Sequence, residues 1–290
     1  MAEQLITIKN ESIKVEISTK GAELRSAQKD GKEYIWNGDP DVWAGRAPVL
    51  FPICGGLKGD KFVFEGKEYS VIKHGYARMS EFVVESHDVD RVVFLLESDD
   101  ESKKMYPFDY EFRVCYFLDG ESLNVEYNVT NTAENGEMYF SFGGHEGYMC
   151  PEGIEEYSLV FDKTERLTTN VLHGNLLSDE YEVLGESITE FPLKYDYFKV
   201  DALTFLNLKS RRVSLVHKDG NRQVDIDFEG HDYMFVWTMA GKNGKYICIE
   251  PWCGVPDFEG SSFDFTQKKG INKLGAGETF SRVHKITLRK

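Results

Sequence analysis

Long hydrophobic stretches are missing from this sequence. No segment approaches the ~20 consecutive apolar residues of a membrane-spanning helix, and the opening MAEQLITIKN lacks the basic and apolar segments of a secretory signal. Basic residues are also few: 34 Lys and Arg stand against 49 Asp and Glu, a formal net charge of -15. This charge repels nucleic-acid phosphates and anionic membrane surfaces. We therefore expect a cytoplasmic protein that binds neither nucleic acid nor membrane.

Cysteine and the motifs of cofactor enzymes are equally scarce. Five cysteines in 290 residues, an odd number, fit reduced buried thiols better than a disulfide framework. Cys248 and Cys253 have no second closely spaced pair to complete a zinc site, and His145-Glu146 is not followed by the second histidine of HExxH. GxSxG, GxxxxGK[ST] and GxGxxG motifs are absent. We expect neither a metal nor a cofactor.

The chain is rich in residues that can form a core: 41% of its residues are hydrophobic and 13% are aromatic. Apolar and polar residues alternate with a period of two, most clearly over residues 112–129, where Asp119-Gly120 separates two β-rich runs. Further turn signals stand at Asp30-Gly31, Glu65-Gly66, Asn135-Gly136 and Asp219-Gly220. A short helix is expected only around 99–106, capped by Asp99 or Asp100 and stopped by Pro107.

These patterns predict an all-β protein, a large antiparallel β-sandwich. Two stacked sheets bury the alternating faces and leave loops at the sheet ends for a site. A closed barrel would account for the same alternation. Because no Pro-, Ser- or Gly-rich linker and no fixed repeat interrupts the chain, we expect a single domain over residues 1–290.

Three segments break the alternation with glycine, histidine, arginine and aromatic residues. They are 45–52 leading to 73–78, then 143–148, and then 249–257. Glycine beside a polar side chain lets the backbone turn sharply and approach a ligand closely. That suits a binding site, and it also suits any tight turn.

Each segment offers a histidine or a carboxylate with two interpretations. His74 has Arg78 nearby, and Arg46 precedes an apolar run that should return beside it, so both arginines could hold ligand hydroxyls. His145 follows two glycines, which let it project from a sheet edge. Either histidine could instead be structural.

Glu250 follows an apolar run that looks like a buried strand and precedes Pro251, which ends regular pairing. Partial desolvation raises the proton affinity of such a carboxylate and makes it a base usable near neutral pH. Trp252 offers an aromatic face for the C–H surface of a ring. The alternative is a structural glutamate paired with an arginine.

Four motifs occur in one order: R-x-P-x-L-F-P at 46–52, H-G-[FY]-A-R at 74–78, G-G-H at 143–145 and I-E-P-W-x-G-x-P-D at 249–257. Together they resemble the aldose 1-epimerase (galactose mutarotase-like) family, in particular its LacX-like bacterial branch, over nearly the whole chain. The resemblance implies an antiparallel β-supersandwich that binds a monosaccharide on its open face. It also implies an isomerase that interconverts α and β anomers by acid–base ring opening, without cofactor or metal.

The resemblance also assigns roles to single residues. Glu250 matches the general base of the family and His145 its general acid, while His74 and Arg46 match ligand-orienting positions. Asp201 is the candidate for a further acidic residue that binds sugar hydroxyls. The predicted catalytic residues are therefore Glu250, His145 and His74, and the predicted substrate contacts are Arg46, Arg78, Asp201 and Trp252.

One departure from the family pattern concerns the residues after Gly-Gly-His, where the branch commonly has proline and a small residue and this chain has Glu146-Gly147. If Glu146 faces the pocket, its charge disfavours a phosphorylated sugar. Two alternatives remain: a hexose-6-phosphate 1-epimerase, in which Lys73, Arg46 and Arg78 would bind phosphate, and a non-catalytic carbohydrate-binding protein on the same fold. A glycoside hydrolase would need a second opposed carboxylate.

Overall fold

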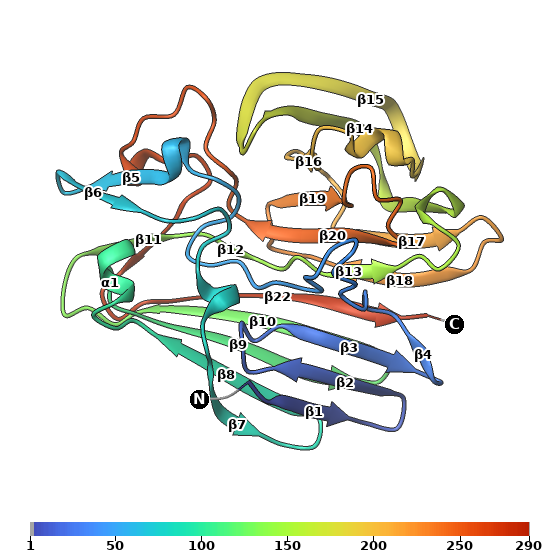
Figure 1. Ribbon diagram of the computed structural model, residues 1–290, viewed down its shortest axis with the longest axis horizontal. Helices are drawn as coiled ribbons and strands as arrows, with labels where there is room; N and C mark the ends of the chain where they lie inside the picture. Colours follow the sequence, from blue (N-terminus) through green and yellow to red (C-terminus); the bar gives the residue numbers. More distant parts are fainter. Residues whose placement is uncertain (1–2, 290) are drawn as a thin grey trace.

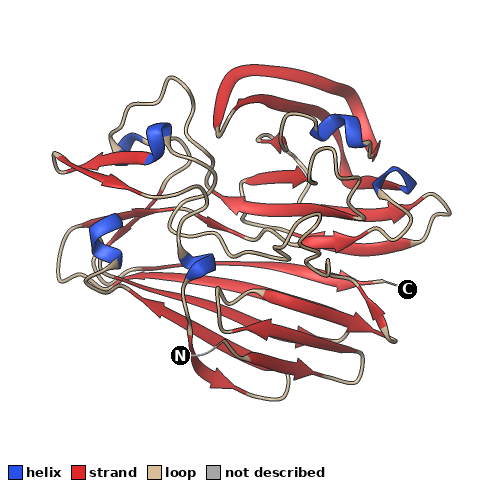
Figure 2. Cartoon of the chain, in the orientation of Figure 1, coloured by secondary structure: helices blue, strands red, loops and turns tan. Residues whose placement is uncertain are grey.

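Strands dominate the computed structural model, which describes residues 3–289 (Figures 1 and 2). Every described strand pair is antiparallel, and most strands belong to three sheets. The largest sheet has the order β15-β14-β17-β18-β22-β10-β9-β8-β7. The predicted all-β, antiparallel architecture is confirmed.

The strands of the nine-stranded sheet are β7 (Val83–His87), β8 (Arg91–Glu97), β9 (Tyr110–Asp119), β10 (Ser122–Asn131), β14 (Tyr157–His173), β15 (Leu176–Pro192), β17 (Arg212–His217), β18 (Arg222–Asp227) and β22 (Thr279–Leu288). The four-stranded sheet contains β1 (Leu5–Lys9), β2 (Ile13–Ser18), β3 (Leu24–Lys29) and β4 (Lys32–Glu33). The five-stranded sheet contains β12 (Phe142–Gly143), β13 (Gly147–Met149), β16 (Leu203–Phe205), β19 (Tyr233–Trp237) and β20 (Tyr246–Cys253). The remaining strands are two pairs, β5 (Lys61–Phe64) with β6 (Lys67–Ser70) and β11 (Glu137–Phe140) with β21 (Asn272–Gly275).

The two smaller sheets face different halves of the large one. In Figure 1, β1–β4 lie over the half that contains β8, β9 and β10, and the Tyr116 hydroxyl on β9 donates to the Ala22 carbonyl between these layers. The β14–β15 hairpin curls over β16 and β19. One cluster of buried apolar side chains includes Val15, Phe112 and Ile249, one residue from each sheet. The layers therefore share a core, and the single-domain organisation stays a prediction.

The turns follow the sequence signals. Asp30-Gly31 and Glu65-Gly66 have positive φ at both positions, 51° and 79° in the first and 50° and 76° in the second. That is the backbone of a type I′ turn, whose twist matches the flanking strands. Between β9 and β10 the turn lies at residues 120–121, one residue later than predicted, because Asp119 still pairs with Ser122.

Helices are short. The predicted helix is α1 (Ser102–Met105), where the Asp99 carboxylate accepts from the Ser102 N–H at 2.7 Å. It ends sooner than predicted because Tyr106 is extended, with φ at -144° and its side chain buried. The 3₁₀ turns are η1 (Lys58–Asp60), η2 (Ala77–Met79), η3 (Ile154–Glu156), η4 (Tyr195–Phe198) and η5 (Phe265–Gln267). No helix within residues 3–289 has the length and apolarity to cross a membrane.

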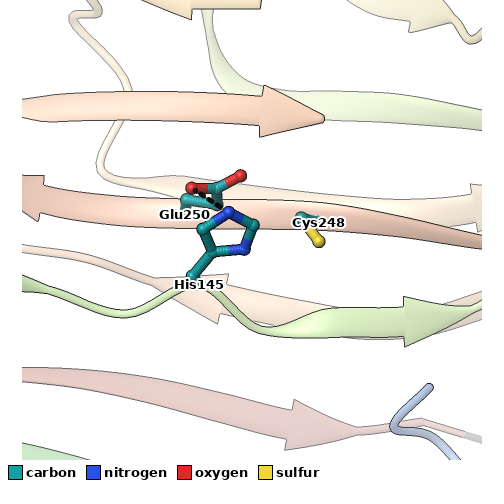
Figure 3. A group of neighbouring side chains, drawn as sticks. All are labelled: His145, Cys248 and Glu250. Atoms are coloured by element: carbon teal, nitrogen blue, oxygen red, sulfur yellow. Dashed lines mark ion pairs between the residues drawn. The ribbon is translucent and has the colours of Figure 1, made fainter. Parts of the chain in front are cut away.

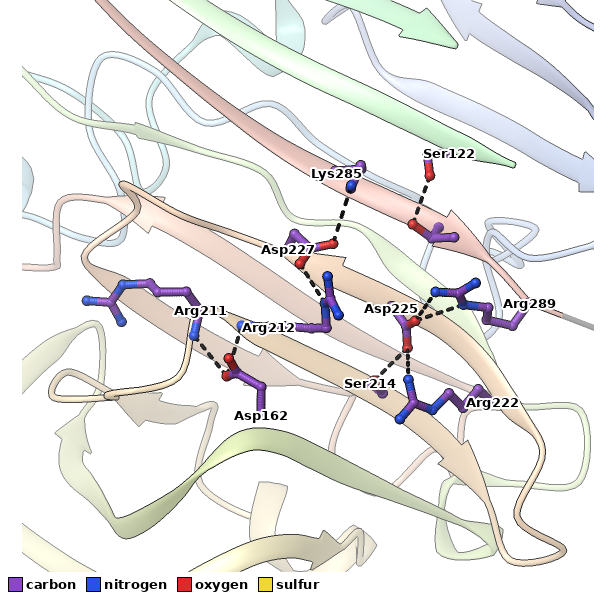
Figure 4. A network of polar contacts seen from close by, with 11 residues as sticks. Ser122, Asp162, Arg211, Arg212, Ser214, Arg222, Asp225, Asp227, Lys285 and Arg289 are labelled. Carbon is purple, nitrogen blue, oxygen red and sulfur yellow. Dashed lines mark hydrogen bonds and ion pairs between the residues drawn. The ribbon is translucent and has the colours of Figure 1, made fainter. Parts of the chain in front are cut away.

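A charged network lies on β17, β18 and β22 of the large sheet (Figure 4). Asp225, with 0% of its surface exposed, accepts from the Ser214 hydroxyl at 2.5 Å and lies 2.6 Å from Arg289 Nη2 and 3.5 Å from Arg222 Nη1. A buried carboxylate is stable when its oxygens are met by donors in this way. The network therefore joins the C-terminal strand to its neighbours.

Candidate active site

A cavity of about 400 Å³ lies beside the five-stranded sheet, where the motif segments converge. This volume is in the ~300–1,000 Å³ range of small-molecule sites. His74, His145 and Glu250 line the cavity, which is closed at one side by Leu172 and Asn175 from the β14–β15 hairpin. A second hollow, of about 720 Å³, is bordered by the acidic residues Glu65, Asp109, Glu137 and Asp264 and by none of the predicted site residues.

Strand register brings His145 to Glu250. Gly143 on β12 pairs with Trp252 and Gly147 on β13 pairs with Cys248, so the intervening His145 lies directly opposite Glu250 on β20. Side chains at directly opposed positions of an antiparallel pair are neighbours, and His145 Nε2 lies 3.4 Å from Glu250 Oε2 (Figure 3). We call these two side chains the His145–Glu250 pair.

Glycine before His145 is required by close packing. A Cβ at Gly143 would lie 2.4 Å from Cδ1 of Trp252, closer than real Cβ contacts allow. The Trp252 indole N–H donates to the Gly144 carbonyl at 3.1 Å, and its ring stacks on Phe235 with centroids 3.8 Å apart. The Gly-Gly-His motif thus fixes Trp252 and His145 together.

The backbone of His74 has an unusual conformation. Its φ is 69°, a left-handed value uncommon for a residue with a side chain. Its N–H donates to the Gly55 carbonyl at 2.9 Å, and its Nδ1 accepts from the Gly55 N–H at 3.2 Å. Because Nδ1 accepts, the proton of the neutral ring is on Nε2, which is left as a donor. The ring lies 5.6 Å from that of His145 and 5.5 Å from that of Trp252, between centroids.

Burial favours the uncharged form of both members of the His145–Glu250 pair. Glu250 is 1% exposed, and this burial raises its pKa well above the usual range, with the charges of Asp201 and Glu146 adding to the rise. Burial lowers the pKa of His145 to about 3, helped by the positive charges of Lys73 and Arg78. At neutral pH the two groups therefore hold one proton between them, as a coupled pair.

Polar side chains on another wall of the cavity come from two distant segments. Lys73 Nζ lies 3.4 Å from Asp201 Oδ2, and the Arg78 guanidinium donates to the Lys73 carbonyl at 3.1 Å. Arg78 Nε is buried, with no partner among residues 3–289. The structure thus brings the predicted Asp201 and Arg78 into one cavity with His74, His145, Glu250 and Trp252.

The structure places Arg46 and Glu146 outside the cavity. The Arg46 guanidinium donates to the Arg25 carbonyl on β3 at 2.8 Å, and Arg46 does not line the cavity, so it is not carried into the proposed site. Glu146 also faces away, with its carboxylate 3.1 Å from His284 Nε2. Successive residues of an extended chain point to opposite sides. Because His145 faces the cavity, Glu146 points away from the cavity into the protein interior.

Sequence reasoning missed two tryptophans. Trp43 and Trp237 line the cavity, with ring centroids 5.4 Å and 5.7 Å from that of His145. Trp43 stands two residues before the first motif segment at Gly45, which is a signal that could have found it. Trp237 lies opposite Cys248 across the β19–β20 register, and this pairing has no local sequence signature.

One group of side chains has the geometry to bind a metal ion. His145, Cys248 and Glu250 each place a ligand atom within 4.8 Å of the other two, and within residues 3–289 no other three His, Cys, Asp or Glu side chains do so (Figure 3). Each of the five cysteines is buried and free, as the sequence predicts.

Comparisons with known proteins agree on one family. A profile of the aldose 1-epimerase family matches residues 4–259. The LacX protein encoded on a plasmid of Lactococcus lactis subsp. lactis is 32% identical over 300 residues, covering 98% of this chain and 99% of that protein.

Solved structures give the same result. A galactose mutarotase related enzyme from Lactobacillus acidophilus is 33% identical with a TM-score of 0.91, over 99% of this chain and 98% of that one. A galactose mutarotase-like protein from Lactobacillus casei ATCC 334 is 28% identical with a TM-score of 0.93, over 98% and 100%.

Proposed function

Because the chain belongs to the aldose 1-epimerase family, we propose that it is an isomerase that interconverts the α and β anomers of a free aldose in this cavity. The observation that carries the proposal is the His145–Glu250 pair, buried at 3.4 Å and lining a sugar-sized cavity. The name of the L. acidophilus relative, a galactose mutarotase related enzyme, points to the same chemistry.

Anomer exchange needs one base and one acid. The base takes the proton of the anomeric hydroxyl while the acid protonates the ring oxygen, which opens the pyranose. Rotation about the C1–C2 bond and reclosure by the reverse proton transfers give the other anomer. In this site Glu250 is the base and His145 the acid, and the two exchange roles on the return step.

The one proton that the His145–Glu250 pair holds provides the one acid and the one base that anomer exchange needs. For Glu250 to act as base, that proton must sit on His145, and sugar hydroxyls that donate to the carboxylate favour this arrangement. A positioned acid or base contributes about 10²–10⁴ in rate, or about 3–5 kcal/mol of barrier. No covalent intermediate is required.

The remaining cavity residues orient the sugar. His74 donates from Nε2, since its Nδ1 is already an acceptor. Asp201, Lys73 and Arg78 offer an acceptor and donors to hydroxyls. Trp252, stacked on Phe235 by one face, borders the site with an apolar ring surface.

Anomer exchange measured by NMR or polarimetry on glucose, galactose and their phosphates tests the proposal. We expect the exchange of at least one free hexose to accelerate in proportion to enzyme concentration. A folded protein that binds these sugars and leaves their exchange at the buffer rate would contradict the proposal in favour of a carbohydrate-binding protein.

A hexose-6-phosphate 1-epimerase is the second candidate, because Lys73 and Arg78 line the cavity and Glu146, which would repel a phosphate, faces away. Asp201 and the net charge of -15 oppose it, since Asp201 lies 3.4 Å from the Lys73 ammonium. We expect free hexoses to be turned over at least as well as their phosphates. A preference for phosphate esters that Arg78→Gln removes would transfer the assignment.

A further inference from the structure

Cys248 has no part in the proposed ring-opening chemistry, yet it lies beside the groups that perform it. Residues two apart on a strand share a face, so Cys248 and Glu250 point the same way from β20, toward His145 (Figure 3). All three side chains are buried, and their ligand atoms lie within 4.8 Å of one another.

We propose that His145, Cys248 and Glu250 form a binding site for a thiophilic divalent cation such as Zn²⁺ or Cd²⁺, and that the bound cation inhibits the enzyme. One imidazole, one thiolate and one carboxylate are the ligand types that zinc takes in proteins. The cation that binds here is not a cofactor of the proposed reaction, because that reaction proceeds by proton transfer between His145, Glu250 and the sugar.

The distances suit a tetrahedral ion. Ligand atoms ~2.0–2.3 Å from a tetrahedral zinc lie ~3.3–3.8 Å from one another. His145 Nε2 and Glu250 Oε2, 3.4 Å apart, already have this spacing. The Cys248 sulfur completes the set by a shift of about an ångström, within reach of χ1 rotation. Because His145 and Glu250 line the cavity, the fourth position is open to water.

Inhibition follows from the loss of proton transfer. The cation binds the Nε2 lone pair of His145 and an oxygen of Glu250, the two atoms that exchange the proton in the proposed reaction. Binding converts the Cys248 thiol to a thiolate and removes the proton of the His145–Glu250 pair, so two protons are released as two anionic ligands meet one divalent cation. A bound sugar and a bound cation therefore exclude each other.

Cys253 provides a matched control on the same strand. It is also buried and free, but an odd spacing from Cys248 directs it to the opposite face of β20, where its sulfur lies 3.8 Å from the Gly230 carbonyl oxygen. It is not part of the three-ligand group.

The experiment titrates the purified protein with Cd²⁺ and Zn²⁺. Cd²⁺ binding is followed by thiolate-to-cadmium absorption, and inhibition is measured against the metal-free rate of each variant. We expect Cys248→Ser to weaken both effects about tenfold or more, Cys253→Ser to respond as wild type, and saturating sugar or a chelator to reverse inhibition. Cys248→Ala serves as a second variant if the serine protein fails to fold.

Two results would overturn the proposal: equal metal affinity in wild type and Cys248→Ser, or a loss of affinity in Cys253→Ser as large as in Cys248→Ser. Cadmium absorption does not depend on turnover. If anomer exchange fails in every sugar, the absorption and its loss in Cys248→Ser and His145→Asn still decide whether the site exists.

Discussion

Two buried carboxylates of this protein have opposite surroundings. Asp225, on the large sheet, meets a serine hydroxyl and two arginines (Figure 4). Glu250, 1% exposed on the five-stranded sheet, meets an imidazole at 3.4 Å, and no lysine or arginine within residues 3–289 lies in ion-pair distance of it. The charge of Asp225 is compensated, whereas burial raises the pKa of Glu250.

The difference separates a carboxylate paired within the fold from the one that we propose to be catalytic. Donors around Asp225 make its ionised form part of the fold, so its removal leaves arginines without their partner. Glu250 has no ion pair with a lysine or arginine of residues 3–289, and the Trp252 side chain and the charge of Lys73 lower its pKa less than burial raises it, so its proton affinity stays high. The following variants test this contrast, from the largest expected effect to the smallest.

Replacing Glu250 should have the largest effect on turnover. Glu250→Gln keeps the side-chain shape and loses the basic oxygen, so we expect anomer exchange to fall about 10²–10⁴-fold, or about 3–5 kcal/mol, with sugar binding largely retained. Its melting temperature should not fall, because a buried amide is easier to desolvate than a carboxylate. Exchange rate and melting temperature are measured on one preparation; a folded variant with near-normal exchange refutes the proposed mechanism.

The two histidines should separate acid catalysis from orientation. His145→Asn should lower exchange by a similar 10²–10⁴-fold with little change in sugar affinity, because it removes the proposed acid. His74→Asn should weaken affinity as well as turnover, because the proposed role of His74 is to orient the ligand. Calorimetric sugar binding beside NMR exchange rates distinguishes them. Equal losses of affinity in both variants would mean that His145 also acts mainly in binding.

Replacing Asp225 should reverse the pattern seen at Glu250. Asp225→Asn leaves Arg222 and Arg289 without their charged partner, and because both arginines are about half exposed we expect a loss of only about 1–3 kcal/mol in unfolding free energy. Exchange per folded molecule should stay at the wild-type rate. Chemical denaturation measures the unfolding free energy, and NMR measures the rate of anomer exchange. A large fall in exchange with unchanged stability would contradict the contrast between Asp225 and Glu250.

The smallest effect is a shift in pH dependence. In the proposed mechanism the His145–Glu250 pair is active while it holds one proton. It loses that proton as pH rises through the raised pKa of Glu250, which sets the alkaline limb. The charge of Glu146 helps to hold this pKa up. Glu146→Gln should therefore lower the pKa of Glu250 and move the alkaline limb to lower pH.

The pH profile of kcat/KM over both limbs checks this shift. Glu165→Gln is the control, since Glu165 is equally buried but accepts backbone N–H groups of Lys209 and Ser210 away from the cavity, and its profile should match wild type. An alkaline limb that stays in place in Glu146→Gln would show that Glu146 acts only through packing with His284.

Local signals accounted for the hairpins and for part of the site. Type I′ turns form at Asp30-Gly31 because the two residues and their flanking alternation suffice to specify them. The role given to Arg46, and the condition on which an effect of Glu146 rested, both depended on the direction of a side chain. That direction is set by contacts with Arg25 and His284, which lie far from them in the sequence.

By itself the sequence determined an antiparallel β protein, because period-two alternation and turn residues act within a few positions. It also determined the family, through four ordered motifs. Only the tertiary structure decided which residues meet: the register of β12 and β13 on β20 sets His145 opposite Glu250, with Cys248 beside them. Register depends on side chains that pack across strands about 100 positions apart, and no local pattern encodes it.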